Sequence, residues 1–313
     1  MILSLKHDAV ADTTKAILEI LLRYRRALYP KAQYQYLPQL RQISRLVETG
    51  DKIILTLPAF PCKSPNTDKV LGPLPDMAER MSLRFLKQLC DEIEKVYAPG
   101  ARVLICSDGH VFGDLIGVSD DTINDYTAAL IDMIKAEQIL CIDIFQLCHV
   151  YPDADFEVQR EMLVEKWARP IPELREEVIS IEHQNKLYCG ITRFLVEDVC
   201  LSSKSMSKSA LQRLSKERAL GVMQRSEAWG NLIAQYHPRT VRLSIHPQPP
   251  GSAKLGIMLL NAADTWVTPW HSVFVDKGNS KLLMKHREAK EICNLVIENG
   301  QPSHYILPNA THC

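Results

Sequence analysis

The sequence has no net charge and no long hydrophobic run. Lys+Arg and Asp+Glu both number 37, which argues against a general role on nucleic acid or at a membrane surface. No apolar stretch approaches the roughly 20 residues of a membrane span. The first ten residues, MILSLKHDAV, lack the apolar stretch and the small-residue cleavage site of a secretory signal. We therefore expect a cytoplasmic protein that binds neither nucleic acid nor membrane.

Several motifs that would identify a cofactor or metal are also absent. The nine cysteines are scattered without any C-x-x-C, so buried reduced thiols are a simpler interpretation than disulfides or a zinc site. G-x-G-x-x-G, the P-loop, G-x-S-x-G and H-E-x-x-H do not occur. Dinucleotide binding, P-loop nucleotide hydrolysis and the common hydrolase and zinc-protease sites are therefore not supported.

Short apolar runs alternate with helical patterns in the first half of the chain. KIILTL (52–57), RVLICS (102–107) and ILCIDIF (139–145) are each followed by a loop and a helical segment. Before the first of these helices, Asp76 and Glu79 have the spacing of a capping box. Alternation of this kind is typical of parallel strands joined by right-handed crossovers. We expect an α/β fold whose core is a Rossmann-like parallel sheet flanked by helices.

The remaining segments predict one domain, 1–313, built around that core. Residues 1–50 have helical patterns, 51–150 form the α/β core, 151–240 are largely helical, and 241–313 are β-rich. In the last segment, SKLLMKHREAKEICNLVIEN (280–299) predicts a final helix and SHYILPNATHC (303–313) an added edge strand. No repeat and no linker divides the chain.

The loop LPAFPCKSPNTDKVLGPLPD (57–76) leaves the carboxyl end of the first predicted strand, where open parallel sheets bind ligands. It holds Lys63 between two prolines, which restrain the backbone. Lys63 could bind an anion or form a Schiff base, or it could be a solvated loop lysine. Ser64 and Asn66 could bind a ligand or satisfy their own turn.

Two further loops should meet the first at the same edge of the sheet. SDGHVFGDLIGVSDD (107–121) carries Asp108, His110 and Asp114. A carboxylate and an imidazole together suit proton transfer at carbon, although Asp108 could simply form an Asp-Gly turn. The loop QLCHVYPDAD (146–155) adds His149 and Tyr151.

Basic and aromatic residues later in the chain could complete a pocket. In the basic segment 204–225, Arg218 and Arg225 lie seven apart on one helix face, with Arg213 near it; such a face could bind phosphate or be merely solvated. Arg242, Ser244 and His246 alternate along a predicted strand, as a pocket wall or a solvent-facing edge would. Trp270 and His271 could line a substrate pocket or fill the core.

Three of these stretches resemble the pyoverdine/dityrosine biosynthesis family, which includes isonitrile (isocyanide) synthases and dityrosine-pathway relatives. They are LPAFPCKSPNTDKVLGPLPDMAE, CSDGHVFGDLIGVSDD and VRLSIHPQPPGSAKLGI. A fourth stretch, SKSMSKSALQRLSKERALGVMQRSEAW, is most similar to the fungal-type branch. The likeness extends from about residue 52 to 271.

The resemblance implies an isonitrile synthase. The α-amine of an amino acid would attack the C2 ketone of ribulose 5-phosphate, and one sugar carbon would remain on nitrogen as the isonitrile, without metal or other cofactor. The amino acid could be aromatic or aliphatic. A downstream Fe(II)/2-oxoglutarate oxygenase acting on the product is an implied partner. Two alternatives stay open: an amino-acid N-formylating enzyme of a dityrosine-type pathway, and a non-catalytic phosphosugar- or amino-acid-binding module.

The resemblance also gives the candidate residues roles. Acid, base or amine catalysis would fall to Lys63, Asp108, His110, Asp114 and His246. Substrate binding would use cations for phosphate and carboxylate, polar side chains, and aromatic rings for the amino-acid side chain; these are Phe60, Ser64, Asn66, Phe112, Arg193, Arg213, Arg218, Arg225, Arg242, Ser244, Trp270 and His271.

Overall fold

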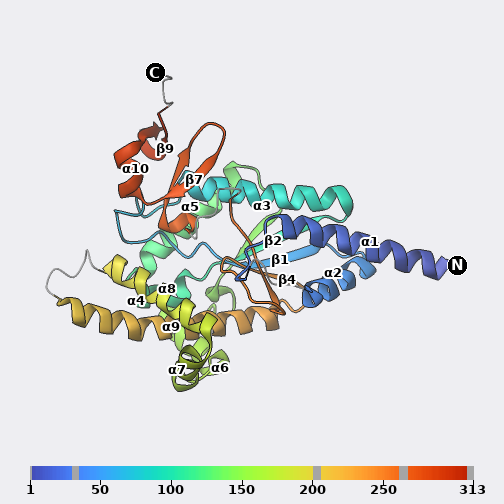
Figure 1. Ribbon diagram of the computed structural model, residues 1–313, viewed down its shortest axis with the longest axis horizontal. Coiled ribbons are helices and arrows are strands. Elements are labelled where there is room, and N and C mark those ends of the chain that lie inside the picture. The colour runs from blue at the N-terminus through green and yellow to red at the C-terminus, as the bar shows by residue number, and fades with distance from the viewer. Residues whose placement is uncertain (1, 30–34, 200–205, 261–266, 309–313) are drawn as a thin grey trace.

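The centre of the computed structural model is a five-stranded parallel sheet (Figure 1). The structure describes residues 2–29, 35–199, 206–260 and 267–308. The strands are β1 (Ile53–Pro58), β2 (Ala101–Cys106), β3 (Ile142–Phe145), β4 (Val241–Ser244) and β5 (Lys254–Gly256). Their order is β3-β2-β1-β4-β5, and every neighbouring pair is parallel. The predicted α/β fold with a Rossmann-like sheet is confirmed.

The strand order reverses between β1 and β4, which makes this point the switch of the sheet. Strands β2 and β3 lie on one side of β1, and the chain then returns to place β4 and β5 on the other side. The loops after neighbouring strands diverge at such a point and leave a crevice for a ligand. The topology therefore directs attention to the loops that follow β1, β2 and β4.

Helices cover the sheet on two sides. The helices are α1 (Ile2–Arg23), α2 (Leu37–Thr49), α3 (Met77–Val96), α4 (Gly109–Ile116), α5 (Asp120–Ala136), α6 (Phe156–Trp167), α7 (Ile171–Ser180), α8 (Glu182–Val199), α9 (Lys208–Tyr236) and α10 (His286–Ile292). In Figure 1 the sheet lies between α3 and the long helix α9. Helix α9 packs against α4, α6, α7 and α8, and its Trp229 Nε1 donates to the carbonyl of Cys106 at 3.2 Å.

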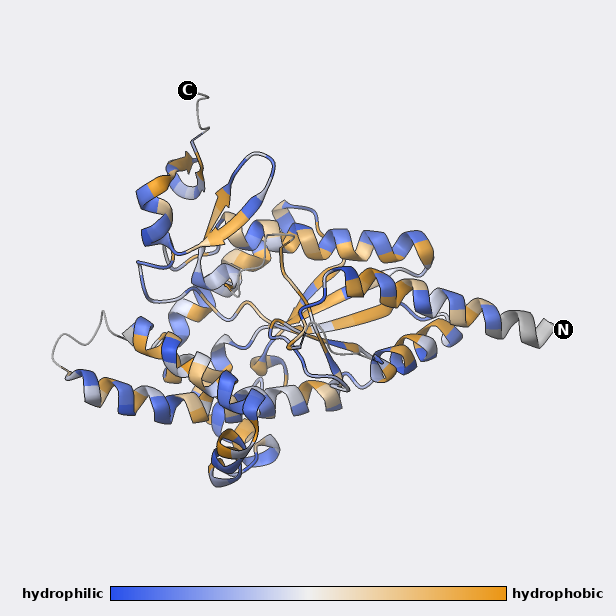
Figure 2. Cartoon of the chain, in the orientation of Figure 1, coloured by the Kyte–Doolittle hydropathy of each residue, from blue (hydrophilic) through white to orange (hydrophobic). Residues whose placement is uncertain are grey.

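The sequence pattern of each element explains its place. The strands of the central sheet are largely hydrophobic (Figure 2), and both faces of a parallel sheet are covered. Helix α3 begins with the expected capping box, in which Asp76 accepts from Ala78 N at 2.8 Å and Glu79 accepts from Asp76 N at 3.0 Å. Among the described helices, none has both the length and the apolarity needed to cross a bilayer.

The end of the chain differs from the expectation. A second sheet has the order β7-β6-β9-β8, from β6 (Val273–Asp276), β7 (Lys281–Met284), β8 (Asn294–Glu298) and β9 (Gln301–Ile306). The prediction of one helix over 280–299 is wrong, because β7 pairs with β6 and β8 pairs with β9, leaving only the short helix α10 between them. The predicted tail strand is present as β9, but it lies inside this sheet.

The loop after β1 comes very close to the start of α4. A Cβ atom added at Gly109 would lie 2.2 Å from the Pro61 carbonyl oxygen and 2.8 Å from Ile123 Cγ2. A backbone oxygen cannot move aside as a flexible side chain can, so only glycine allows this approach. Gly109 thus fixes the distance between the loops that follow β1 and β2.

Replacing Gly109 with alanine should therefore destabilise the protein by at least ~1–3 kcal/mol, the usual cost of overpacking. The matched control is Gly190→Ala in the exposed interior of α8, where an added Cβ meets nothing within 4 Å. This control should be neutral or stabilising by up to ~1 kcal/mol, because alanine favours helix. Urea unfolding of the two variants measures both values, and equal midpoints would contradict the close approach.

Candidate active site

Lys63 lies in a buried ion-pair cluster. Its side chain is inaccessible to solvent, and its Nζ lies 2.9 Å from Asp76 Oδ2, 2.8 Å from Glu79 Oε2 and 3.2 Å from the Pro269 carbonyl. Burial alone would lower the pKa of Lys63, but Asp76 and Glu79 raise it above its ordinary value. Schiff-base chemistry needs a neutral amine, so this geometry favours an anchoring role, and catalysis by Lys63 stays a prediction.

The rest of the proline-rich loop is bound to the end of α8. Ser64 Oγ donates to Asp198 Oδ1 at 2.9 Å, and Lys69 Nζ lies 2.6 Å from the same oxygen. Asn66 Nδ2 donates to the Glu197 carbonyl at 2.9 Å. Ser64 and Asn66 therefore hold the loop in place, and their contact with a substrate stays a prediction. Proline restricts the loop backbone, while these bonds determine its position.

Asp108 has the most unusual environment of the predicted catalytic residues. It follows β2 directly and precedes α4, yet it makes no side-chain cap for that helix. Its Oδ1 atom is inaccessible and has no hydrogen-bond partner among the described residues. Burial raises the pKa of Asp108 to about 7, against a smaller opposing effect of its own backbone. Asp108 can therefore exchange a proton near neutral pH, as a general acid or base must.

His110 is held in a network of polar side chains on the outer side of α4. Its Nδ1 lies 3.0 Å from Asp120 Oδ1 and its Nε2 3.1 Å from Asn124 Oδ1. Its ring stacks on Phe156 at a centroid distance of 3.7 Å. Burial lowers the pKa of His110, although Asp120 opposes this. Both ring nitrogens are occupied, so His110 joins helices in this structure.

Asp114 belongs to the same network. Its Oδ1 lies 2.5 Å from Arg225 Nη1 and 3.7 Å from Arg160 Nε, and Arg160 also pairs with Asp120 at 2.8 Å. Asp108 therefore differs from His110 and Asp114, because only Asp108 combines a buried carboxyl oxygen with the lack of a partner. The catalytic roles of His110 and Asp114 and the substrate role of Arg225 stay predictions.

Two cations lie against α9, on the side of the sheet that this helix covers. Arg242 on β4 and Lys254 on β5 are partners in the strand ladder. Arg242 Nη2 donates to the Gly230 carbonyl of α9 at 2.9 Å. Cys106 connects the two parts of the site: burial raises its pKa, and Asp108 and Arg242 are the charged groups near enough to act on it. Arg242 and Lys254 thus lie next to the switch point, on the two strands added after the order reverses.

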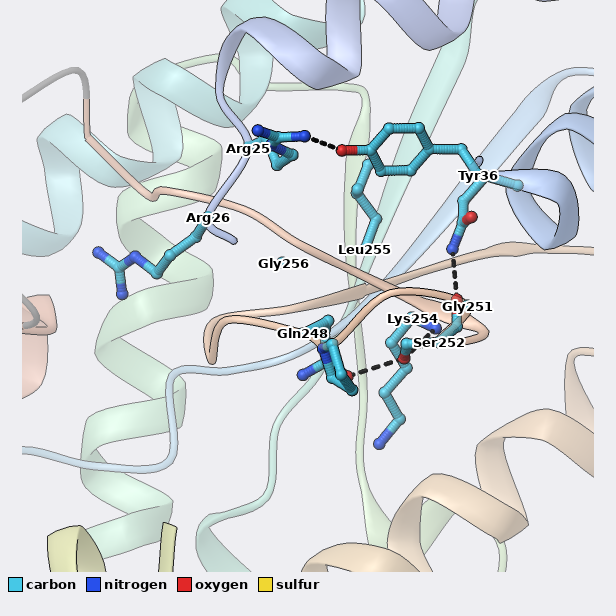
Figure 3. A pocket seen from close by; sticks show the side chains of 11 residues that line it. Arg25, Arg26, Tyr36, Gln248, Gly251, Ser252, Lys254, Leu255 and Gly256 are labelled. Carbon is cyan, nitrogen blue, oxygen red and sulfur yellow. Dashed lines mark hydrogen bonds between the residues drawn. The ribbon is translucent and has the colours of Figure 1, made fainter. Parts of the chain in front are cut away.

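The loop after β4 forms the edge of this site. Ser244 Oγ accepts from His246 N at 3.1 Å and from Gln248 Nε2 at 3.2 Å, so it organises the turn. His246 lies beyond the end of β4 with much of its surface exposed. Arg26 and Lys254 are the cations near enough to act on the imidazole. A shallow pocket, partly open to solvent, lies alongside this loop (Figure 3).

The other predicted binding residues are dispersed. Phe60 and Trp270 are buried and pack together at a centroid distance of 5.4 Å, and buried Phe112 interrupts the regular geometry of α4. The remaining four are the half-buried His271, whose Nδ1 lies 2.9 Å from Thr268 Oγ1, the exposed Arg193 and Arg213, and the half-buried Arg218. None of these observations tests a contact with substrate.

Sequence reasoning missed Lys254 and Asp198. Lys254 lies within the stretch GSAKLGI, but only the strand register places it beside Arg242. Asp198 receives Ser64 and Lys69 from more than a hundred residues earlier in the chain, and no local pattern marks that pairing.

Comparison with known proteins extends the resemblance to most of the chain. A family model described as pyoverdine/dityrosine biosynthesis protein matches residues 43–296. The chain belongs to this family. Its members' fold is also shared: the crystal structure of the PvcA protein from Pseudomonas aeruginosa superposes with a TM-score of 0.89 at 45% identity, covering 95% of this chain and 100% of that chain.

The similar family members include three isonitrile synthases. The L-tyrosine isonitrile synthase of Pseudomonas aeruginosa is 47% identical, covering 86% of this chain and 84% of the relative. The L-tyrosine isonitrile synthase of Xenorhabdus nematophila is 43% identical, covering 95% of this chain and 92% of the relative. The L-tryptophan isonitrile synthase AmbI2 of Fischerella ambigua is 42% identical over 86% and 82%. Fungal relatives such as the isocyanide synthase xanB of Aspergillus fumigatus reach 31%, so overall identity favours the bacterial proteins over the fungal-type branch.

Loss of the Lys63 amine should leave two carboxylates buried without their cation. We expect Lys63→Met to lower the free energy of unfolding by about 3–5 kcal/mol, as breaking a buried pair does. The loss should be smaller at pH 5 than at pH 8, because burial raises the pKa of Glu79 to about 7 and protonation removes one charge. Chemical denaturation at both pH values measures this. Lys281→Met, an exposed lysine on β7, is the control and should stay within about 0.5 kcal/mol.

Asp108 should make stability depend on pH with a defined sign. Its pKa of about 7 in the folded state lies above the roughly 3.9 of an unfolded aspartate, so the folded state binds more protons between these values. Stability contributed by this group is therefore lost as the pH rises from about 4 to 7. Asp108→Asn should match the native protein near pH 4 and become the more stable of the two by pH 7.5, measured by urea midpoints. A native protein that stays the more stable at pH 7.5 would contradict this prediction.

Proposed function

We propose that this protein is an isonitrile synthase that joins the α-amine of an amino acid to the C2 carbon of ribulose 5-phosphate. The observation that carries the proposal is the 47% identity, over most of both chains, to an L-tyrosine isonitrile synthase. The relatives between 40% and 47% identity are named for L-tyrosine or L-tryptophan, so an aromatic amino acid is the proposed substrate.

The site geometry supports this reaction class. Attack of an amine on a ketone gives a carbinolamine, which loses water to form an imine. Each step moves a proton between nitrogen and oxygen, and a group with a pKa near the working pH does this best. Asp108 is that group in our proposal, while Arg242 and Lys254 supply positive charge for the substrates' anionic groups. The proline-rich loop, already ordered by its bonds to α3 and α8, would reduce the ordering cost of binding.

Two alternatives remain as outcomes of the test, a formylation reaction and a non-catalytic binding module. The spore wall maturation protein DIT1 of Saccharomyces cerevisiae is 28% identical, covering 77% of this chain, so a dityrosine-type formylation belongs to the same family chemistry. A binding module would retain the phosphosugar without consuming it.

We further propose that an Fe(II)/2-oxoglutarate oxygenase acts on the product.

The deciding experiment incubates the purified protein with ribulose 5-phosphate and each of the twenty amino acids. A tetrazine probe traps an isonitrile, and mass spectrometry identifies the adduct. We expect an adduct with an aromatic amino acid, and at least ~100-fold less of it from Asp108→Asn, the usual scale for losing a general acid or base. Asp132→Asn, which removes an exposed carboxylate on α5, is the matched control. Consumption of the sugar with only a formamide product would favour the formylation, and an untouched sugar would contradict both.

A further inference from the structure

Most partly buried cations of this protein pair with a carboxylate; Arg242 and Lys254 are exceptions among the described residues, as is Arg218. Lys63, Lys69, Arg160, Arg169 and Arg225 each lie within 4 Å of a carboxylate. In the described part of the chain, neither Arg242 nor Lys254 has such a partner, and both are half-buried. The pKa of Lys254 is lowered by burial and then by Arg242, so the two groups destabilise each other's charge.

Glu227 is the acid near enough to act on Lys254, but its carboxylate is already paired. Glu227 raises the pKa of Lys254 slightly, but its two carboxylate oxygens already accept from Arg169 at 2.6 and 2.8 Å. Bringing two like charges together and partly out of water costs free energy unless an anion joins them. The folded protein therefore lacks one negative charge at this place.

Gly230 of α9 lies against both cationic groups. A Cβ atom there would lie 3.2 Å from Lys254 Nζ, closer than side chains normally pack, and 3.4 Å from Arg242 Nη2. Glycine inside a helix such as α9 costs about 1 kcal/mol relative to alanine. The helix thus gives up stability at the one turn that faces both cationic groups.

Lys254 also lines a shallow pocket that is partly open to solvent. In Figure 3 the Lys254 side chain extends away from Arg25 and Tyr36, and its amine approaches α9 at Gly230. The charged end of Lys254 therefore lies on the α9 side, together with Arg242.

We propose that Arg242 and Lys254 form the subsite of the active site that receives a substrate phosphate or carboxylate, with Gly230 allowing both cationic groups to lie together against α9. The guanidinium can bind two oxygens at once, and the ammonium adds a compact charge beside it. This subsite rests on the proposed function for the identity of its ligand, which is the phosphate of the phosphosugar or the α-carboxylate of the amino acid.

The test measures binding of ribulose 5-phosphate and of L-tyrosine separately, by isothermal titration, to the native protein, Lys254→Met and Gly230→Ala. We expect Lys254→Met to weaken one of the two ligands by about tenfold or more, the usual scale for a hydrogen bond to a charged group. Selective loss of the sugar phosphate assigns the phosphate, and selective loss of tyrosine assigns the carboxylate. Unchanged affinity for both ligands would overturn the subsite.

Gly230→Ala separates binding from folding. This variant keeps both cations but moves the amine, so it should weaken the same ligand while its unfolding temperature stays equal to or above that of the native protein. Lys281→Met is the control for loss of a positive charge and should bind both ligands normally. A Gly230→Ala protein with native affinity would contradict the role of Gly230 in placing the cations, even if Lys254→Met failed to fold.

A final arm keeps the subsite and the proposed function distinguishable. Inorganic phosphate is titrated against the thermal unfolding of the native protein and of Lys254→Met. Phosphate stabilisation that disappears in the variant, without any isonitrile product from the native protein, would support the subsite and remove the synthase. Isonitrile formation that continues at the native rate in Lys254→Met would retain the synthase and overturn the subsite.

Discussion

The buried contact of Lys63 with Asp76 and Glu79 connects the parts of the protein that form the site. Lys63 belongs to the loop after β1, whereas the two acids begin α3, and Pro269 accepts from the same amine. A buried ammonium is costly unless its partners are in place, so the proline-rich loop, α3 and the segment before β6 must assemble together. The position of the proline-rich loop at this edge of the sheet depends on that assembly.

Charge is divided between two kinds of environment. Asp114, Asp120, Arg160 and Arg225 pair with one another on the outer side of α4, and such pairs join helices. Among the described residues, Asp108 Oδ1 instead lacks a hydrogen-bond partner, and Arg242 and Lys254 lack a carboxylate partner. Groups that are left unsatisfied inside a fold otherwise so well paired are where a ligand's charges and protons can be received.

The sequence predicted the secondary structure of the central sheet better than that of the C-terminal segment. The apolar runs at 52–57, 102–107 and 139–145 are strands, and the capping box at Asp76 begins α3. The predicted helix at 280–299 failed because strand pairing with β6 and β9 overrides local helical pattern. For the site, the sequence named Asp108, His110 and Asp114 as candidates in one loop, and nothing local distinguished Asp108 from the other two. The catalytic role of Asp108 stays a prediction.

Local chemistry by itself determined the alternation of strands and helices, the rigid loop and the supply of charged residues, because hydrophobic period, proline and capping act over a few neighbouring positions. The tertiary structure decided which charges are neutralised. Lys63 meets its acids through the folding of the loop back onto the start of α3. Lys254 lies beside Arg242 because β5 pairs with β4. A charge's partner is set by distance in space and by exclusion of water, and neither is written in the spacing of residues along the chain.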